Sequence, residues 1–361
     1  YTYDLEGKRV GIIGTGATAV QVVPEIAKVV KELYIFQRTP STIDVRDQRA
    51  TTQEEIDAWS KEPGWAKARR ERLATISSGR TALQGNDDFL AGRVTQLKER
   101  KVYERQLSPE EMVQAQLNTN FRIMEQIRAR VDEVVKDPKT AAALKPYYPY
   151  GCKRPTFHDE YLPTFNLPHV QLVDTAPLGV SRITPKGVVH EGVEYELDAL
   201  IYATGFEWMA TGTFNMIKGR DGRTLRDKWR DEGVRTFLGL HSHGFPNLLI
   251  MSGPQGGGGQ FNFTRGLEGH TDYVVWMLQT MKQRGARIVD VKKENEDAYA
   301  KHCREADLMT APLRDCLSYY NGDGNAEPGS LAYYGGPAKW HHMRTEAQAS
   351  LEPYVFGNRS P

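Results

Sequence analysis

A glycine-rich turn near the amino terminus constrains the fold of this chain more than any other feature. It follows the apolar residues 10–13, opens a helical stretch that runs to about Val30, and consists of Gly14, Thr15, Gly16, Ala17, Thr18 and Ala19. The spacing Gly-x-Gly-x-x-Ala between a strand and a helix is typical of a dinucleotide-binding turn, because the glycines let backbone approach a pyrophosphate closely. We therefore predict a Rossmann-like α/β fold, with an ordinary strand-to-helix turn as the alternative.

The residue after the second predicted strand indicates which dinucleotide is bound. Residues 33–36 form an apolar run that is followed by Gln37, Arg38 and Thr39, without an acid. An Asp or Glu in this place binds the ribose hydroxyls of NAD, whereas a guanidinium can grip the 2′-phosphate of NADP with two bonds. The sequence therefore predicts NADP, with Arg38 on its 2′-phosphate. The alternative is a surface arginine in an ion pair.

Composition excludes several other partners. The 47 basic and 46 acidic residues nearly balance, which disfavours nucleic acid and anionic membranes as partners. No apolar run is long enough to span a bilayer, and the chain starts at Tyr1 without a secretory leader. The cysteines, Cys152, Cys303 and Cys316, are odd in number and widely spaced, which predicts reduced thiols and no metal cluster. We expect a cytoplasmic protein.

The organisation of the chain follows from changes in composition. Residues 48–145 are rich in charged residues and Ala, and read as a helical insertion within an NADP-binding domain made of residues 1–47 and 146–206. Residues 207–361 are predicted to return to an FAD- and substrate-binding domain. Their carboxyl-terminal part is predicted to wrap over the surface of that domain. One helix of the insertion starts at Ser108 and carries a predicted buried stripe, or a pocket lining, of Met112, Leu117, Phe121, Met124 and Ile127.

Two later junctions are candidates for cofactor contact. An apolar strand at residues 199–203 ends in Thr204 and Gly205, and ligands of doubly wound sheets bind beyond the carboxyl ends of strands. Gly253 and Gln255 precede the glycines at 256–259 and a helix at about 263–284, whose positive amino end could face a flavin ring. The alternatives are a bare strand-to-turn junction and a flexible loop before a helix.

A basic pair closes the insertion. Because Pro155 disfavours helical backbone before it, Lys153 and Arg154 should be extended and project to opposite faces. Lys153 could then reach the 2′-phosphate held by Arg38, while Arg154 points to where flavin and substrate would meet. The alternative is two solvated bases in a loop.

These motifs together resemble a known family. The stretch 7–40, the Gly-Cys-Lys-Arg of 151–154, the Ala-Thr-Gly-Phe of 203–206 and the Gly-Phe-Pro-Asn-Leu of 244–248 resemble class B flavoprotein monooxygenases of Baeyer–Villiger type. The resemblance implies an FAD domain and an NADP domain with a helical insertion. It also implies that NADPH, FAD and O2 convert a ketone into an ester or lactone.

The resemblance also implies roles for single residues. Arg38, Thr39 and Lys153 would bind the 2′-phosphate side of NADP, and Arg154 would be the catalytic arginine. The pyrophosphate would be bound by Thr15, Gly16, Ala17, Thr18, Ala19, Val20 and Gln21. The glycine run at 256–259 and the pair Tyr319 and Tyr320 would lie near a pocket for a bulky or polycyclic ketone.

The sequence departs from the family in one respect. The amino-terminal FAD-binding fold, with its own glycine-rich turn, is not recognisable, so we expect an amino-terminal FAD-binding half as a partner of this chain. Two other functions remain open. One is an N- or S-hydroxylating flavin monooxygenase, and the other is a flavin-free NADP-binding regulatory module.

Overall fold

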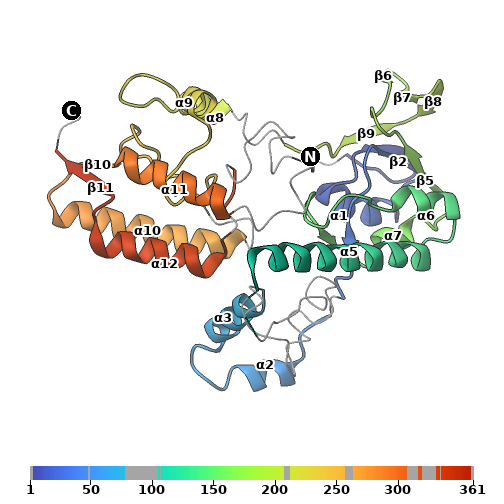
Figure 1. The fold of residues 1–361 in the computed structure, drawn as a ribbon. Helices are drawn as coiled ribbons and strands as arrows, with labels where there is room; N and C mark the ends of the chain where they lie inside the picture. The colour runs from blue at the N-terminus through green and yellow to red at the C-terminus, as the bar shows by residue number, and fades with distance from the viewer. Residues whose placement is uncertain are drawn as a thin grey trace. The chain divides into compact units, whose positions relative to one another are not determined.

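Two compact units make up the chain in the computed structural model. Unit 1 covers Tyr1–Phe206 and unit 2 covers Glu207–Pro361 (Figure 1). The structure describes residues 3–47, 49–77, 105, 107–206, 212–256, 263–306, 316–318, 331–333 and 335–358. The division into an NADP-binding domain, a helical insertion and an FAD and substrate domain stays a prediction.

Unit 1 is built on a parallel sheet. Its four strands lie in the order β5-β2-β1-β9, and both neighbours of the central strand β1 run parallel to it. The strands are β1 (Arg9–Ile13), β2 (Glu32–Gln37), β5 (Val170–Asp174) and β9 (Ala199–Tyr202). This arrangement confirms the predicted Rossmann-like α/β fold.

Helix α1 (Ala17–Ile26) packs on this sheet through a small apolar face. Ala19 and Val23 are fully buried in one core with Val10 and Ile12 of β1. Burial of β1 on both faces explains its uninterrupted apolar sequence. The helix ends at Ile26, before the predicted end at Val30.

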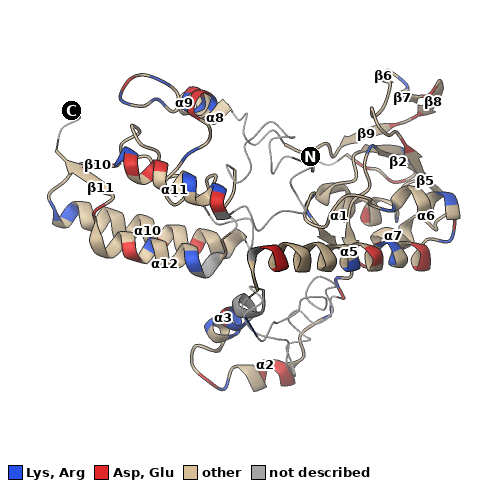
Figure 2. Ribbon diagram, viewed as in Figure 1, with Lys and Arg blue, Asp and Glu red and all other residues tan. Residues whose placement is uncertain are grey.

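The helical region between β3 and β4 contains the long helix α5. Its elements are α2 (Gln53–Trp59), α3 (Trp65–Ser77), α5 (Pro109–Val134) and α6 (Pro138–Leu144). The predicted start of α5 is confirmed, because Ser108 and Glu111 cap each other's backbone and Pro109 takes the first position. Bands of both charges follow along α5 (Figure 2).

The predicted buried stripe of α5 is partly wrong. Met124 and Ile127 are buried, but Phe121 is 64% exposed, while Met112 and Leu117 are half-buried. The buried face instead follows Ile123, Met124, Ile127 and Val131. Phe121 lies outside it because each residue advances about 100° around a helix.

Smaller elements complete unit 1. The short strands β3 (Ile43–Asp44) and β4 (Thr156–Phe157) pair in parallel, with Ile43 opposite Thr156. Helix α7 (Tyr161–Thr164) follows β4. The antiparallel sheet comprises β6 (Arg182–Thr184), β7 (Gly187–His190) and β8 (Val193–Glu196).

Unit 2 is mainly helical. Its helices are α8 (Gly212–Met216), α9 (Leu225–Glu232), α10 (Phe263–Gln283), α11 (Lys293–Ala306) and α12 (Pro337–Ser350). The antiparallel strands β10 (Ile288–Val291) and β11 (Tyr354–Gly357) pair beside them. The helix predicted at 263–284 is confirmed as α10.

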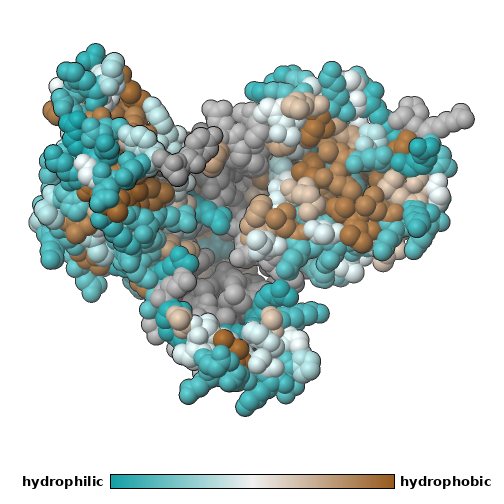
Figure 3. All heavy atoms as spheres, turned by 180° about the vertical axis from the view of Figure 1, so that it is seen from behind, coloured by the Kyte–Doolittle hydropathy of each residue, from teal (hydrophilic) through white to brown (hydrophobic). Residues whose placement is uncertain are grey.

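One face of unit 2 is apolar. It appears as the brown area in Figure 3, and on α10 Val275 and Leu278 are 48% and 56% exposed. The buried face of the same helix carries Tyr273 and Met277. Within the described part of the chain, every helix is too short or too polar to cross a membrane.

Candidate dinucleotide-binding site

Gly14 brings the turn after β1 against the end of β9. Its φ of +105° is a conformation that L side chains rarely adopt, and a Cβ there would lie 2.4 Å from the carbonyl oxygen of Ala203. Its N–H donates to the carbonyl of Phe36 at 3.0 Å. Only glycine therefore allows the carboxyl ends of β1, β2 and β9 to meet here. Chain order reverses between β1 and β9, which is where such sheets bind ligands.

The amino end of α1 is open beside this turn. Gly16 caps the helix without a side-chain hydrogen bond, and a Cβ on Gly16 would meet nothing within 4 Å. Ala17 and Thr18 are exposed, and the first amides of a helix have no partner within it. The space and the positive helix end suit a pyrophosphate.

We expect the two glycines of the turn to respond differently to alanine. Gly14→Ala should lower the free energy of unfolding by about 2 kcal/mol, because the methyl meets backbone at a positive φ. Gly16→Ala, with φ −72° and open space, should leave stability nearly unchanged but weaken nucleotide binding. Urea unfolding and calorimetric titration with NADP+ would separate the two effects. Equal losses of stability would contradict this assignment.

Later residues of the motif contribute in different ways. Ala19 and Val20 are buried, and the Val20 N–H already donates to the carbonyl of Gly16. The Gln21 side chain is exposed, and its amide donates to the carbonyl of Ala17. Ala19 and Val20 therefore serve packing through their side chains, and the predicted pyrophosphate contact of Val20 lacks a free donor.

Thr15 ties the turn to the segment after β2. Its hydroxyl donates to the carbonyl of Thr39 at 2.6 Å, and its own carbonyl accepts from the Ser41 hydroxyl. Thr15 is only 4% exposed, so both bonds are shielded from water. The segment that carries Arg38 is thereby held beside the turn.

Arg38 extends from the end of β2 into solvent. Among the described residues, no side chain or backbone group forms a hydrogen bond or ion pair with it. The alternative of a surface ion pair is therefore not observed in this part of the chain. An unused guanidinium beside an open helix end is the arrangement that a 2′-phosphate requires.

Lys153 is linked to the same segment through Tyr148. The Tyr148 hydroxyl donates to the carbonyl of Pro40 at 2.8 Å, and the Lys153 ammonium lies 5.8 Å from the centre of the Tyr148 ring. Burial raises the pKa of Tyr148, which keeps its hydroxyl a donor. Lys153 is therefore linked through Tyr148 to the segment that follows Arg38, and its contact with a 2′-phosphate stays a prediction.

Arg154 and the β9 junction are exposed. Arg154 directly precedes Pro155 and strand β4, and its side chain is open to solvent. Thr204 and Gly205 follow β9, are also exposed, and a Cβ on Gly205 would meet nothing within 4 Å. The Gly205 position leaves space for a ligand, and the contacts of both places with a cofactor stay predictions.

Gln255 has a different task from the predicted one. It is 1% exposed, its side-chain oxygen accepts from the backbone and hydroxyl of Thr236, and its amide donates to the carbonyl of Val234. Its backbone carbonyl accepts from the Tyr299 hydroxyl at 2.7 Å. Because these groups are occupied within unit 2, Gln255 fixes the loop, and its predicted cofactor contact has no support in these bonds.

Gly253 is also a packing residue. A Cβ there would lie 2.6 Å from the Ile250 side chain and 2.8 Å from the carbonyl of Gly239. The predicted cofactor contact of Gly253 therefore has no support in its surroundings. Of the glycine run, residues 257–259 lie outside the described residues, as do Tyr319 and Tyr320.

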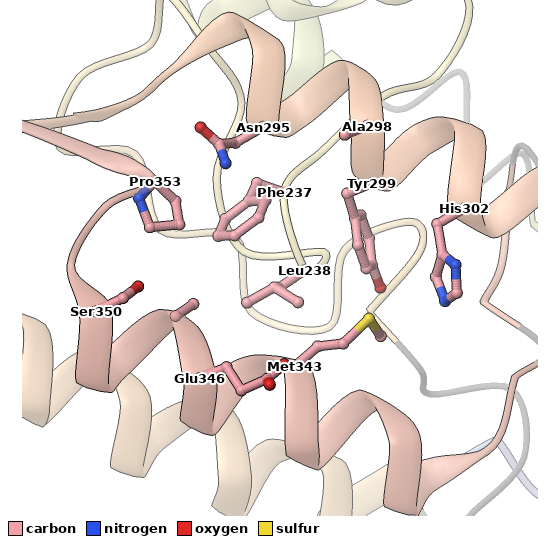
Figure 4. Close-up of a pocket in the computed structure, with 11 residues that line it drawn as sticks. Phe237, Leu238, Asn295, Ala298, Tyr299, His302, Met343, Glu346, Ser350 and Pro353 are labelled. Atoms are coloured by element: carbon pink, nitrogen blue, oxygen red, sulfur yellow. The ribbon is translucent and has the colours of Figure 1, made fainter.

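A groove of about 320 Å³ lies between α11 and α12 of unit 2 (Figure 4). Tyr299 and His302 project into it from α11, and Met343 projects from α12. None of the predicted site residues lines it.

The cysteine prediction is only partly correct. Cys303 is a free thiol, and burial raises its pKa to about 12. Cys152 and Cys316 are disulfide-bonded, so the expectation of three reduced thiols is wrong.

Comparison with known proteins identifies relatives along nearly the whole chain. No family model matches it. It is 42% identical over 335 residues to a Baeyer–Villiger monooxygenase of Stachybotrys chlorohalonatus, a match that covers 89% of this chain and 52% of the relative. The chain thus spans about half the length of that protein.

Solved structures give the same result. A polycyclic ketone monooxygenase from Thermothelomyces thermophila superposes with a TM-score of 0.83 and 35% identity, covering 99% of this chain and 60% of that one. OTEMO in complex with FAD and NADP superposes with a TM-score of 0.76 and 25% identity, covering 98% and 67%. Nearly the whole chain is therefore similar to part of the Baeyer–Villiger monooxygenases.

Proposed function

We propose that this chain is the NADP-binding and substrate-side part of a Baeyer–Villiger monooxygenase. The observation that carries the proposal is the open amino end of α1 beside Arg38, a guanidinium without a partner among the described residues. The relatives named above support the reaction, in which one atom of O2 is inserted next to a ketone carbonyl. The name of the Thermothelomyces relative favours a bulky or polycyclic ketone.

The residues of unit 1 fit NADP directly. The amides at the start of α1 would bind the pyrophosphate, and Arg38 and Lys153 would bind the 2′-phosphate. The carbonyl of Thr39 is occupied by Thr15, so Thr39 would act by fixing the segment that carries Arg38. Thr204 and Gly205 would border the nucleotide at the end of β9.

Residues for FAD are not assigned. Within the described residues, Gly14–Gly16 is the one glycine-rich turn between a parallel strand and a helix. FAD would supply the chemistry with oxygen, and Arg154 would supply a fixed positive charge for an anion formed in that reaction. The amino-terminal FAD-binding half stays a prediction, since the comparisons match this chain and only part of each relative. The cytoplasmic location also stays a prediction.

Binding of the two nicotinamide dinucleotides tests the proposal. Arg38→Ala should raise the Kd for NADP+ by about tenfold to a hundredfold, because a charge-assisted bidentate contact is lost. The Kd for NAD+, which has no 2′-phosphate, should stay within about twofold. Arg182→Ala is the matched control, because Arg182 is also exposed in unit 1 but lies on β6.

Calorimetric titration of the chain measures both constants. Equal affinity of the unaltered chain for NADP+ and NAD+ would overturn the assignment of Arg38. NADPH turnover with a ketone and FAD would favour the monooxygenase, whereas tight NADP+ binding without turnover would favour the regulatory module.

A further inference from the structure

The loop that carries Lys153 and Arg154 has little regular structure of its own. Between α6 and β4 the chain contains one turn, in which the Cys152 N–H donates to the carbonyl of Pro149. Gly151 lies within this turn and has a φ of +90°. The directions of the two basic side chains therefore depend on where the loop is attached to neighbouring elements.

Asn120 of α5 makes such an attachment with both halves of its amide. Its oxygen accepts from the Tyr150 N–H at 2.8 Å, and its nitrogen donates to the Tyr150 carbonyl at 3.0 Å. One side chain thus satisfies both backbone groups of one loop residue. The pairing fixes the position of the loop and the orientation of the Tyr150 backbone.

Packing supports this pairing. The Tyr150 ring is buried in a small cluster with Ile123, Met124 and Ile127, all on the buried face of α5. Asn120 lies one turn before these residues on the same face, where a polar side chain needs partners. Its only protein partners in the described structure are the two backbone groups of Tyr150.

The attachment to Asn120 lies just before the basic pair in the chain, and a second attachment lies just after it. After the pair, Thr156 donates its N–H and its hydroxyl to the carbonyl of Thr42, at 3.0 and 2.8 Å. Tyr148, held to Pro40, lies further away. Residues 151–155 therefore lie between two attachments, at Asn120 on α5 and at Thr42 before β3, and Cys152 within this segment is disulfide-bonded.

We propose that Asn120 is a positioning residue for the loop of the basic pair, and that it aims Lys153 at the 2′-phosphate of the nucleotide. The inference rests on the proposed function, because it requires that Lys153 binds the 2′-phosphate. The side chain of Asn120 contacts the backbone of Tyr150, so Asn120 acts through the loop and touches neither nucleotide nor substrate. Helix α5, which the sequence places in an insertion, thereby becomes part of the binding machinery.

The test compares two neighbouring asparagines. Asn120→Ala should raise the Kd for NADP+ by about tenfold, the effect of losing two hydrogen bonds that hold the loop, and leave the Kd for NAD+ within about twofold. Asn118→Ala is the control, because Asn118 is exposed and, among the described residues, only accepts a bond from Gln114 on the same helix. It should change neither constant.

A double variant shows whether the effect passes through Lys153. Asn120→Ala combined with Lys153→Ala should bind NADP+ no more weakly than Lys153→Ala alone, because the loop then has no ammonium to aim. Additive losses would overturn the proposal, as would equal losses of NADP+ and NAD+ affinity, which indicate a merely structural role. A normal NADP+ affinity of Lys153→Ala would also overturn it. Failure of the proposed function itself appears separately, as a lack of NADP+ preference in the unaltered chain.

Discussion

Arg154→Ala should lower ketone-dependent oxygen insertion by about a hundredfold to a thousandfold, the effect of removing one preplaced charge that stabilises a developing anion. A guanidinium remains charged across the working pH range, so its contribution is electrostatic and not a proton transfer. The exposed position of Arg154, directly before the fixed strand β4, gives it access to a ligand. Arg154→Lys should recover part of the activity, since it keeps the charge but loses the planar fork.

The measurement uses the flavin-containing protein with NADPH, a bicyclic ketone and, separately, a thioether. Gas chromatography quantifies lactone and sulfoxide. Lactone formation should collapse in Arg154→Ala, while sulfoxide formation and the KM for NADPH change much less. A parallel loss of both products would contradict the assigned role. Unchanged lactone formation would contradict it as well, whereas sulfoxide without lactone from the unaltered protein would favour the N- or S-hydroxylating alternative.

Glu296→Ala should produce the largest loss of stability, about 3 to 5 kcal/mol in the free energy of unfolding of unit 2. Lys228 and Glu296 are 2% and 0% exposed, and the ammonium donates to the carboxylate at 2.8 and 2.9 Å. The carboxylate also accepts from the Ser242 hydroxyl and the His243 N–H. Burial lowers the pKa of Lys228, and the carboxylate opposes this effect. Without it, a charged or unpaired amine remains in the core.

Urea unfolding checks this prediction against an exposed pair on the same helix. Lys301 and Glu305 lie 3.8 Å apart with mostly exposed side chains, so Glu305→Ala should cost less than about 1 kcal/mol. Replacing both buried partners, in Lys228→Met with Glu296→Leu, should recover much of the loss, because no unpaired charge is left. A loss in Glu296→Ala as small as that in Glu305→Ala would contradict the account.

The strand, glycine-rich turn and helix could be predicted because these parts follow one another in the chain. The strand β1, the glycines, the start of α1 and Arg38 all lie within 30 residues, from Arg9 to Arg38, and each carries a local signal. Strand β9 could be placed at the site because its apolar run ends in small residues. The fold class followed from this unit alone.

The polar residues that hold the site and the core in place could not be predicted from such local signals. Asn120 and Tyr150 are 30 residues apart, and Lys228 and Glu296 are 68 residues apart. A polar side chain that pairs over such distances has the same sequence signature as a solvated one. Gln255 shows the converse case, since a polar residue beside glycines suggested a ligand contact, yet its side chain is buried and bonds to Thr236 and Val234.

A crystal structure of the chain with NADP+ tests the central claim most directly. We predict the pyrophosphate at the amides of Ala17 and Thr18, and the 2′-phosphate within about 3 Å of the Arg38 guanidinium. A nucleotide bound away from Gly14–Gly16, or a 2′-phosphate directed into solvent with Arg38 turned away, would contradict the account.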